Sequence, residues 1–194
     1  MRLILQSLAL FVMFSLYCTG CVSDPGQENT WSESSKFNNV GIFSQGMPQR
    51  KFLWAEAPHI RICEFSPASK EQVANAAKWW EERGYVFDVI SGRGLWGGCK
   101  KESIAGTITI SLSGQGFNFA RDHMGETRIY HTPEGGILQA RIEIAYASRD
   151  SPRVLEHELG HALGWGHYDV TGHIMNSAYS RGGYDDTHIS MHSE

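Results

Sequence analysis

The sequence predicts a single domain of the α+β class, in which several strands combine with two helices. The chain has 194 residues, which is room for one medium domain. Segments 107–113 and 138–146 alternate apolar and polar residues with the period of two that is typical of half-buried strands. Two further segments, which begin after Ser69 and Ser151, place apolar residues at helical spacing instead.

Composition and charge narrow the class of protein. Hydrophobic residues make up 41% of the chain and charged residues 20%, enough apolar material for a packed core, so wholesale disorder is excluded. Seventeen Lys and Arg face 21 Asp and Glu, for a net charge of −4. No basic block is long enough to follow a phosphate backbone, so we expect no nucleic-acid partner. We also expect a monomer.

The amino terminus has the pattern of an export signal. In residues 1–20, Arg2 precedes an apolar stretch from Leu3 to Tyr17, and small residues follow it. A membrane-spanning helix needs roughly 20 apolar residues, so this stretch is too short to be one. We therefore interpret residues 1–20 as a signal peptide.

The end of this segment, Cys18-Thr19-Gly20-Cys21, resembles a bacterial lipoprotein signal, although Cys18 stands where that pattern usually has Leu. The resemblance implies that Cys21 becomes the lipidated first residue of the mature chain and anchors it to a membrane of the cell envelope. The alternative is simple secretion, with Cys21 as an ordinary cysteine.

Two cysteines remain in the mature chain after Cys21. An exported chain with only Cys63 and Cys99 left favours one disulfide between them. Closing a loop of that length would stabilise the fold by roughly 3–4 kcal/mol in the chain-entropy model. A pair of buried thiols is the alternative.

Residues 21–50 comprise the anchor cysteine and a polar stretch without helical or strand period. We interpret this stretch as a tether, with a short pro-segment as the alternative. The folded domain is then expected over residues 51–194, beginning near Lys51.

The elements of this domain follow in order. Residues 59–65 form a β-rich run, and Ser69 with Gln72 makes a capping box for a helix that ends near Gly84. Strands are expected at 85–91, 107–113, 126–132 and 138–146, and a brief last helix near 188–192. The glycines of 92–97 have the spacing of a dinucleotide fingerprint, but no helix pattern follows them, so a loop is expected there.

The second helix carries the chemistry. Ser151 is expected to cap it, with Pro152 at its first position. His157 and His161 are four residues apart, so their rings project from the same face. Packing residues lie roughly 150° away around the helix, at 100° per residue; these are Leu155, Leu159 and Ala162.

A third histidine follows a glycine turn. Gly164 lets the chain leave the helix in a left-handed conformation, and His167 comes three residues later. A catalytic zinc takes three protein ligands and leaves its fourth position to water. His157, His161 and His167 are therefore predicted to bind Zn²⁺, with Glu158 placed to accept the proton of that water.

This pattern, HELGHALGWGH over residues 157–167, resembles the signature of the metzincin zinc peptidases. The resemblance implies a zincin-like domain: a twisted mixed sheet, a backing helix, an active-site helix and a small C-terminal subdomain. It also implies that Met175 forms a Met-turn below the metal, with a structural role like that of Gly164. The edge strand at 126–132 would then receive an extended peptide substrate.

Some features fit no particular metzincin subfamily. Seven residues separate His167 from Met175, Tyr168 follows the third histidine, and 19 residues follow Met175. We therefore expect an exported zinc endopeptidase of unassigned subfamily, acting on protein or peptide substrates. The alternatives are an envelope lipoprotein that keeps zinc as a structural staple, and a zinc amidase that acts on a non-protein amide.

Overall fold

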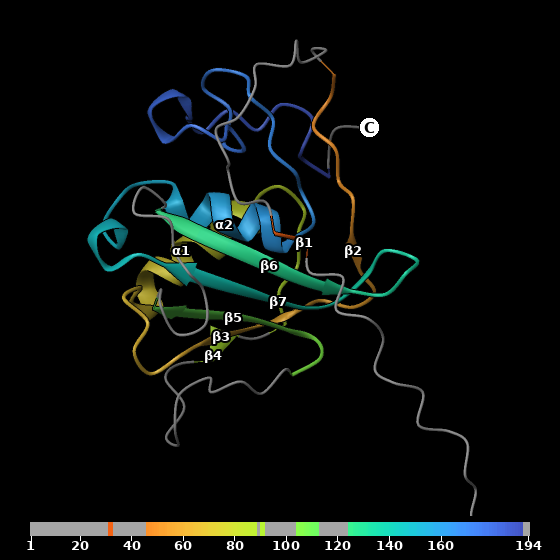
Figure 1. Ribbon diagram of the computed structural model, residues 1–194, viewed down its shortest axis with the longest axis vertical. Coiled ribbons are helices and arrows are strands. Elements are labelled where there is room, and N and C mark those ends of the chain that lie inside the picture. Colours follow the sequence, from red (N-terminus) through yellow and green to blue (C-terminus); the bar gives the residue numbers. More distant parts are fainter. Residues whose placement is uncertain (1–30, 33–45, 89, 92–103, 113–123, 192–194) are drawn as a thin grey trace, which may run out of the picture.

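The computed structural model describes residues 31–32, 46–88, 90–91, 104–112 and 124–191. They form one mixed, mostly parallel sheet and two α-helices, in agreement with the predicted α+β class (Figure 1). The strands lie in the order β1-β6-β7-β5-β3-β4, and β2 pairs with β7 outside this path. Cys21 and Cys99, the signal segment and the glycine-rich run at 92–97 lie outside the described residues.

The strands pair in two ways. Their bounds are β1 Trp31–Ser32, β2 Leu53–Trp54, β3 His59–Ile62, β4 Ile90–Ser91, β5 Thr107–Leu112, β6 Gly125–His131 and β7 Gly136–Ile144. Parallel pairs join β4 to β3, β3 to β5, β5 to β7 and β2 to β7. Antiparallel pairs join β6 to β7 and β1 to β6, so β6 lies between the long strand β7 and the two-residue strand β1.

One face of the sheet is apolar because its strands alternate side chains with a period of two. Its fully buried members come from β3, β5, β6 and β7: Ile60, Ile62, Ile108, Ile110, Ile129, Ala140, Ile142 and Ile144. Both helices pack on this face, α1 (Lys70–Glu81) and α2 (Val154–Ala162), and α2 lies along β6 (Figure 1). The core therefore fixes α2 against the outer part of the sheet.

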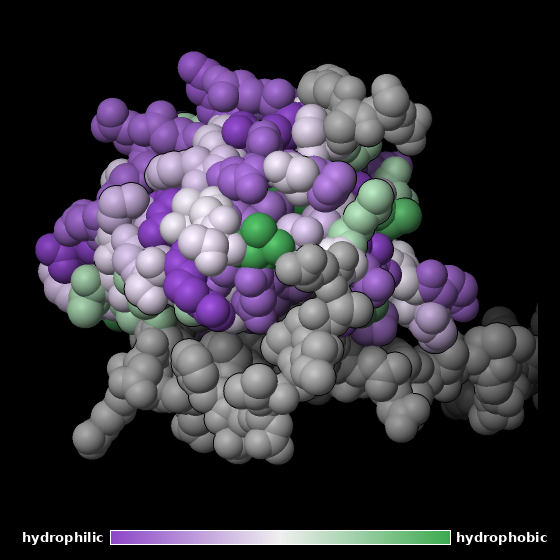
Figure 2. Space-filling model, turned by 90° about the horizontal axis from the view of Figure 1, so that it is seen from above, coloured by the Kyte–Doolittle hydropathy of each residue, from purple (hydrophilic) through white to green (hydrophobic). Residues whose placement is uncertain are grey.

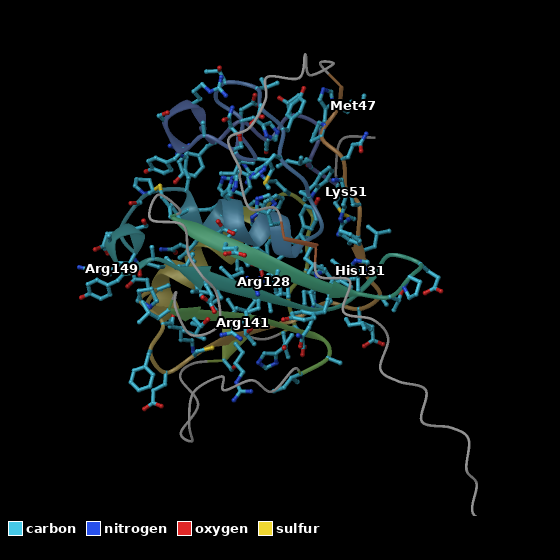
Figure 3. All side chains as sticks on the ribbon, viewed as in Figure 1. Met47, Lys51, Arg128, His131, Arg141 and Arg149 are labelled. Atoms are coloured by element: carbon cyan, nitrogen blue, oxygen red, sulfur yellow. The ribbon has the colours of Figure 1, made fainter. Side chains whose placement is uncertain are left out.

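The opposite face carries charged side chains. Arg128 of β6 lies directly across from Arg141 of β7, and both project from neighbouring strands in Figure 3. Each strand pairs its own charges, because Arg128 lies 3.2 Å from Glu126 and Arg141 lies 2.9 Å from the buried Glu143. These pairs offset the repulsion between like charges that face each other across the strands.

A β-bulge changes the predicted face of β7 at its start. Tyr130 pairs with Gln139 but the next residue of β6, His131, pairs with Ile137, so one residue of β7 is skipped. Ile137 is buried as a result, and Leu138, which alternation places in the core, is 48% exposed.

Helix α1 follows the prediction closely. Ser69 accepts from the backbone N–H of Gln72, and the Gln72 side chain accepts from the backbone N–H of Ser69, so the capping box is present. Val73, Ala76, Ala77 and Trp80 form its buried face. Gly84 follows the helix with a φ of +89°, a conformation that glycine adopts without strain.

Three local expectations are wrong. The segment at 85–91 is a strand only at Ile90–Ser91 among its described residues, because Tyr85 and Phe87 turn into the core. Helix α2 begins at Val154 after Arg153, whose φ is +68°, so Ser151 is not its cap. The expected helix at 188–192 is a turn in its described part, and a short 3-10 helix lies at Tyr179–Arg181 instead.

The chain before β2 is already attached to the domain. Gln49 accepts a hydrogen bond from the backbone N–H of Gly166, and the Arg50 side chain donates to the carbonyl of Leu163. The domain thus begins slightly before Lys51, the expected start. Cys63 takes part in a disulfide bond, and its predicted partner lies outside the described residues.

Candidate metal centre

Three histidine side chains meet at the end of α2. The Nε2 atom of His161 lies 3.0 Å from that of His157 and 3.1 Å from that of His167. Among the described residues, they form the group of three side chains whose ligand atoms can hold a metal ion, all within 4.8 Å of one another. The prediction that these three residues converge is therefore confirmed.

Main-chain carbonyls orient two of the rings. His157 places Nδ1 2.7 Å from the carbonyl oxygen of Ile174, and His161 places Nδ1 2.8 Å from that of Trp165. A neutral ring donates from Nδ1 to such a carbonyl and keeps its lone pair on Nε2. The lone pairs of His157 and His161 therefore point at each other, an arrangement that a cation between them stabilises.

Gly164 turns the chain so that His167 can join the other two. Its φ of +99° is in the left-handed region, and its backbone N–H donates to the carbonyl of His161. A Cβ at this position would collide with the carbonyl oxygen of Phe52, in the segment ahead of β2. Glycine is thus required by conformation and by space.

Met175 and His173 form a buried layer at the metal centre, and both are fully shielded from solvent. The backbone N–H of Met175 donates to Nδ1 of His173 at 3.0 Å. A Cβ on Gly160 of α2 would collide with the sulfur of Met175 and lie 2.7 Å from the Trp80 ring. Met175 therefore packs against α2.

Backbone hydrogen bonds hold the short connection between His167 and Met175. Tyr168 donates from its N–H to the carbonyl of Met175 at 2.8 Å, which closes the connection at its base. Asp169 accepts from the N–H of Ser177 at 2.9 Å and from its hydroxyl at 2.5 Å. The segment after His167, the predicted third ligand, is thus tied to the chain that follows Met175.

Glu158 follows His157 in α2 and is almost completely buried, with 6% of its surface exposed. The hydroxyl of Thr127, on β6, lies 2.5 Å from its Oε2 atom. Burial raises the pKa of Glu158 to about 8, and the charge of Glu126 acts in the same direction, while the Thr127 hydroxyl opposes both. A carboxyl group tuned to this range can accept and release a proton near neutral pH.

Burial also keeps the three histidines neutral. It lowers the pKa of His157, lowers that of His161 well below its usual value, and lowers that of His167 to about 3. The neighbouring imidazoles and Lys51, which lies ahead of β2 (Figure 3), add to the effect at His161 and His167. Neutral imidazoles are the form that binds a metal ion.

Seen from above, the described surface is largely hydrophilic, with separate small apolar spots (Figure 2). Within the described ranges, no helix has both the length and the apolar character to cross a bilayer. The chain matches no protein-family model and no curated protein.

Three residues of the site were not found by sequence reasoning. Thr127 and Gly125 of β6 contact Glu158, and His173 holds the backbone of Met175. Thr127 lies inside a predicted strand, and His173 belongs to no motif that the sequence analysis used. Its proximity to Met175 in the sequence was the signal available for His173.

Proposed function

We propose that this protein is a zinc-dependent endopeptidase of the metzincin type. The observation that carries the proposal is the convergence of three neutral imidazoles at the end of α2, the helix that also carries the buried Glu158. His157, His161 and His167 are the proposed ligands, and Glu158 is the proposed general base. Met175 and Gly164 have the proposed structural roles, and the zincin-like fold is part of the same proposal.

The donor set fits zinc. Zinc–nitrogen bonds of 2.0–2.1 Å at tetrahedral angles separate two nitrogen ligands by roughly 3.3 Å. The Nε2 separations of 3.0 and 3.1 Å are close to that value, so small shifts suffice to accommodate the ion. Three nitrogen ligands leave one position of the tetrahedron for water or substrate, as catalytic zinc sites do.

The chemistry then follows from the charges at the site. Zinc, when bound, polarises the scissile carbonyl and lowers the pKa of a coordinated water. Glu158 accepts the proton of the attacking water and delivers it to the leaving amine. Burial raises the pKa of Glu158 to about 8 in the metal-free protein, and the positive charge of zinc, when bound, would favour the charged carboxylate that accepts the proton.

The outer side of β6, where the two-residue strand β1 pairs, supplies a surface for the substrate. β1 pairs with β6 in antiparallel register, with Trp31 opposite Ile129 and Ser32 opposite Arg128. This pairing is evidence that the outer edge of β6 accepts an extended strand, which is how many peptides bind to a sheet. Because Thr127 of β6 contacts Glu158, a peptide on this edge lies close to the proposed base.

The test is hydrolysis of a diverse peptide pool by the metal-loaded protein, with cleavage sites identified by mass spectrometry. The Glu158→Gln variant is the matched control, because it keeps the three histidines and removes the base. We expect cleavage by the wild type, none by the variant, and one zinc per chain in both. Zinc binding without cleavage by the wild type would favour the zinc-stapled lipoprotein, and cleavage of only non-protein amides would favour the amidase.

The location of the enzyme is a second part of the proposal. The lipoprotein-like segment ending at Cys21 supports an exported, membrane-anchored protein of the bacterial cell envelope. Expression with the native amino terminus, followed by mass spectrometry of the mature chain, tests it. A free amino-terminal Cys21 would favour simple secretion.

A further inference from the structure

The carboxyl group of Glu158 is enclosed by two residues of β6. Thr127 and Gly125 are two positions apart, so both belong to the face of β6 on which α2 packs. The Thr127 hydroxyl lies 2.5 Å from Oε2 of Glu158. On the other side, a Cβ on Gly125 would lie 2.6 Å from Oε1 and 2.8 Å from the carboxyl carbon.

Thr127 is a polar residue on the apolar face of the sheet. Its partner across the pair with β7 is Ile142, and Ile129 follows it on β6; both are fully buried. A buried hydroxyl is unfavourable unless it forms hydrogen bonds. The Thr127 hydroxyl has two acceptors within hydrogen-bond distance, and both belong to Glu158: Oε2 and, at 3.1 Å, the main-chain carbonyl oxygen.

Gly125 completes the enclosure from the backbone side. Its register partner, Ile144, is buried, and the Glu158 carboxyl lies in the space that a Cβ on Gly125 would fill. Any side chain at this position would push the carboxyl away from β6. The contact therefore depends on the absence of a Cβ.

We propose that Thr127 and Gly125 are positioning residues that fix the orientation of the Glu158 carboxyl group for proton transfer. The inference rests on the proposed function of Glu158. Thr127 holds Oε2 by a hydrogen bond, and the backbone of Gly125 limits the position of Oε1. Through them, the strand that binds the substrate also sets the position of the base.

The two acceptors of the Thr127 hydroxyl suit a group that exchanges a proton during the reaction. The hydroxyl donates to Oε2 while the carboxylate is charged. Once Glu158 has taken the proton from water, Oε2 can donate to the Thr127 oxygen, whose own proton turns to the carbonyl of Glu158. Glu158 thus keeps this partner in both forms until the proton passes to the leaving amine.

The test compares Thr127→Val, which has the same shape without the hydroxyl, with Thr127→Ser, which retains it. We expect Thr127→Val to lower kcat about 10–100-fold, with KM and zinc content unchanged, since misplacing a catalytic group acts on the transition state. Thr127→Ser should recover most of the rate. Thr107→Val is the matched control, because Thr107 is also buried in a strand but donates to Ile104.

A second measurement is independent of turnover. Crystal structures of the zinc-loaded variants should show the Glu158 carboxyl in its wild-type orientation in Thr127→Ser and turned away from β6 in Thr127→Val, because only the valine lacks the hydrogen bond to Oε2. Gly125→Ala should lower kcat like Thr127→Val while zinc still binds.

The outcomes separate the two proposals. If the wild type binds zinc and hydrolyses nothing while the carboxyl turns in Thr127→Val, the peptidase proposal fails and the contact between Thr127 and Glu158 stands. If Thr127→Val keeps the wild-type kcat and the wild-type carboxyl orientation, the positioning role is refuted. A loss of activity in Thr127→Ser or Thr107→Val as large as that in Thr127→Val would also refute it, because the loss would then reflect packing alone.

Discussion

Gly164 controls whether the third histidine reaches the metal centre, and replacing it with alanine tests that role. Its φ of +99° lies in the left-handed region, and its missing side chain leaves room for the carbonyl oxygen of Phe52. Alanine would therefore lower the free energy of unfolding in two separate ways, through the strained backbone conformation and through the collision. His167 lies three residues further on, so a shift of the turn displaces this ligand.

The two costs can be separated with a second glycine. Gly106 precedes β5 with a φ of +75°, and a Cβ there would meet nothing within 4 Å. Gly106→Ala should therefore show the conformational cost alone, about 1–2 kcal/mol. Gly164→Ala adds overpacking against the main chain, about 1–3 kcal/mol more, so we expect about 2–5 kcal/mol in total.

Urea unfolding of the metal-free variants measures these free energies, and competition with a chromophoric chelator measures zinc affinity. Displacement of a ligand should weaken zinc binding at least as much as loss of an outer partner does, about 10–100-fold. We expect this loss in Gly164→Ala and wild-type affinity in Gly106→Ala. Equal destabilisation of the two variants with equal, unchanged zinc affinity would refute the role assigned to Gly164.

Three further predictions follow from the charges and the sheet edge. First, buried neutral histidines take up protons on unfolding, so the metal-free protein should lose stability as the pH falls below 6.5, by up to about 1.4 kcal/mol per pH unit for each histidine. Glu158 takes up a proton on folding between pH 4.5 and 8 and so offsets one histidine, and a rise in stability as the pH falls below 6.5, measured by urea unfolding, would contradict this reasoning. Second, Glu158 holds its proton at pH 7 without metal. Zinc binding should therefore release one more proton from the wild type than from Glu158→Gln, as measured by calorimetry in buffers of different ionisation enthalpy. Equal release would show that Glu158 is already charged. Third, Trp31→Pro removes a backbone donor from β1 and should lower KM for extended peptides, because β1 pairs with the same edge of β6. An unchanged KM would argue against that edge as the substrate site.

The sequence predicts the elements that depend on local patterns. Period two identified β5 and β7, and the Ser69 capping box identified the start of α1, because each signal lies within one element. The ligand set was predictable for the same reason. His157, His161 and His167 lie within eleven residues, so one helix turn and one glycine turn fix their relative positions.

Features that depend on pairing between distant segments could not be predicted in this way. The bulge that buries Ile137 and exposes Leu138 arises from the register between β6 and β7, and neither strand carries a glycine signal at the bulge itself. The start of α2 differs from the capping rule at Ser151 because Arg153 adopts a left-handed conformation and donates to the carbonyl of Tyr179. The conformation at the start of α2 thus depends on a contact with a residue 26 positions further along the chain.

Groups outside the three histidines orient the rings, so the histidine motif alone is an incomplete description of the candidate metal centre. The carbonyls of Ile174 and Trp165 orient His157 and His161, and any residue type supplies a carbonyl, so no sequence pattern marks these positions. These carbonyls orient the rings only if the backbone itself is held in place. Next to Ile174, the His173 side chain holds the backbone by accepting a hydrogen bond from the N–H of Met175. Replacement of His173 should therefore loosen the carbonyl that orients His157 and weaken metal binding, although His173 itself is not among the three ligands. The specificity of the ligand set thus resides partly in side chains whose contribution becomes visible only once the chain is folded.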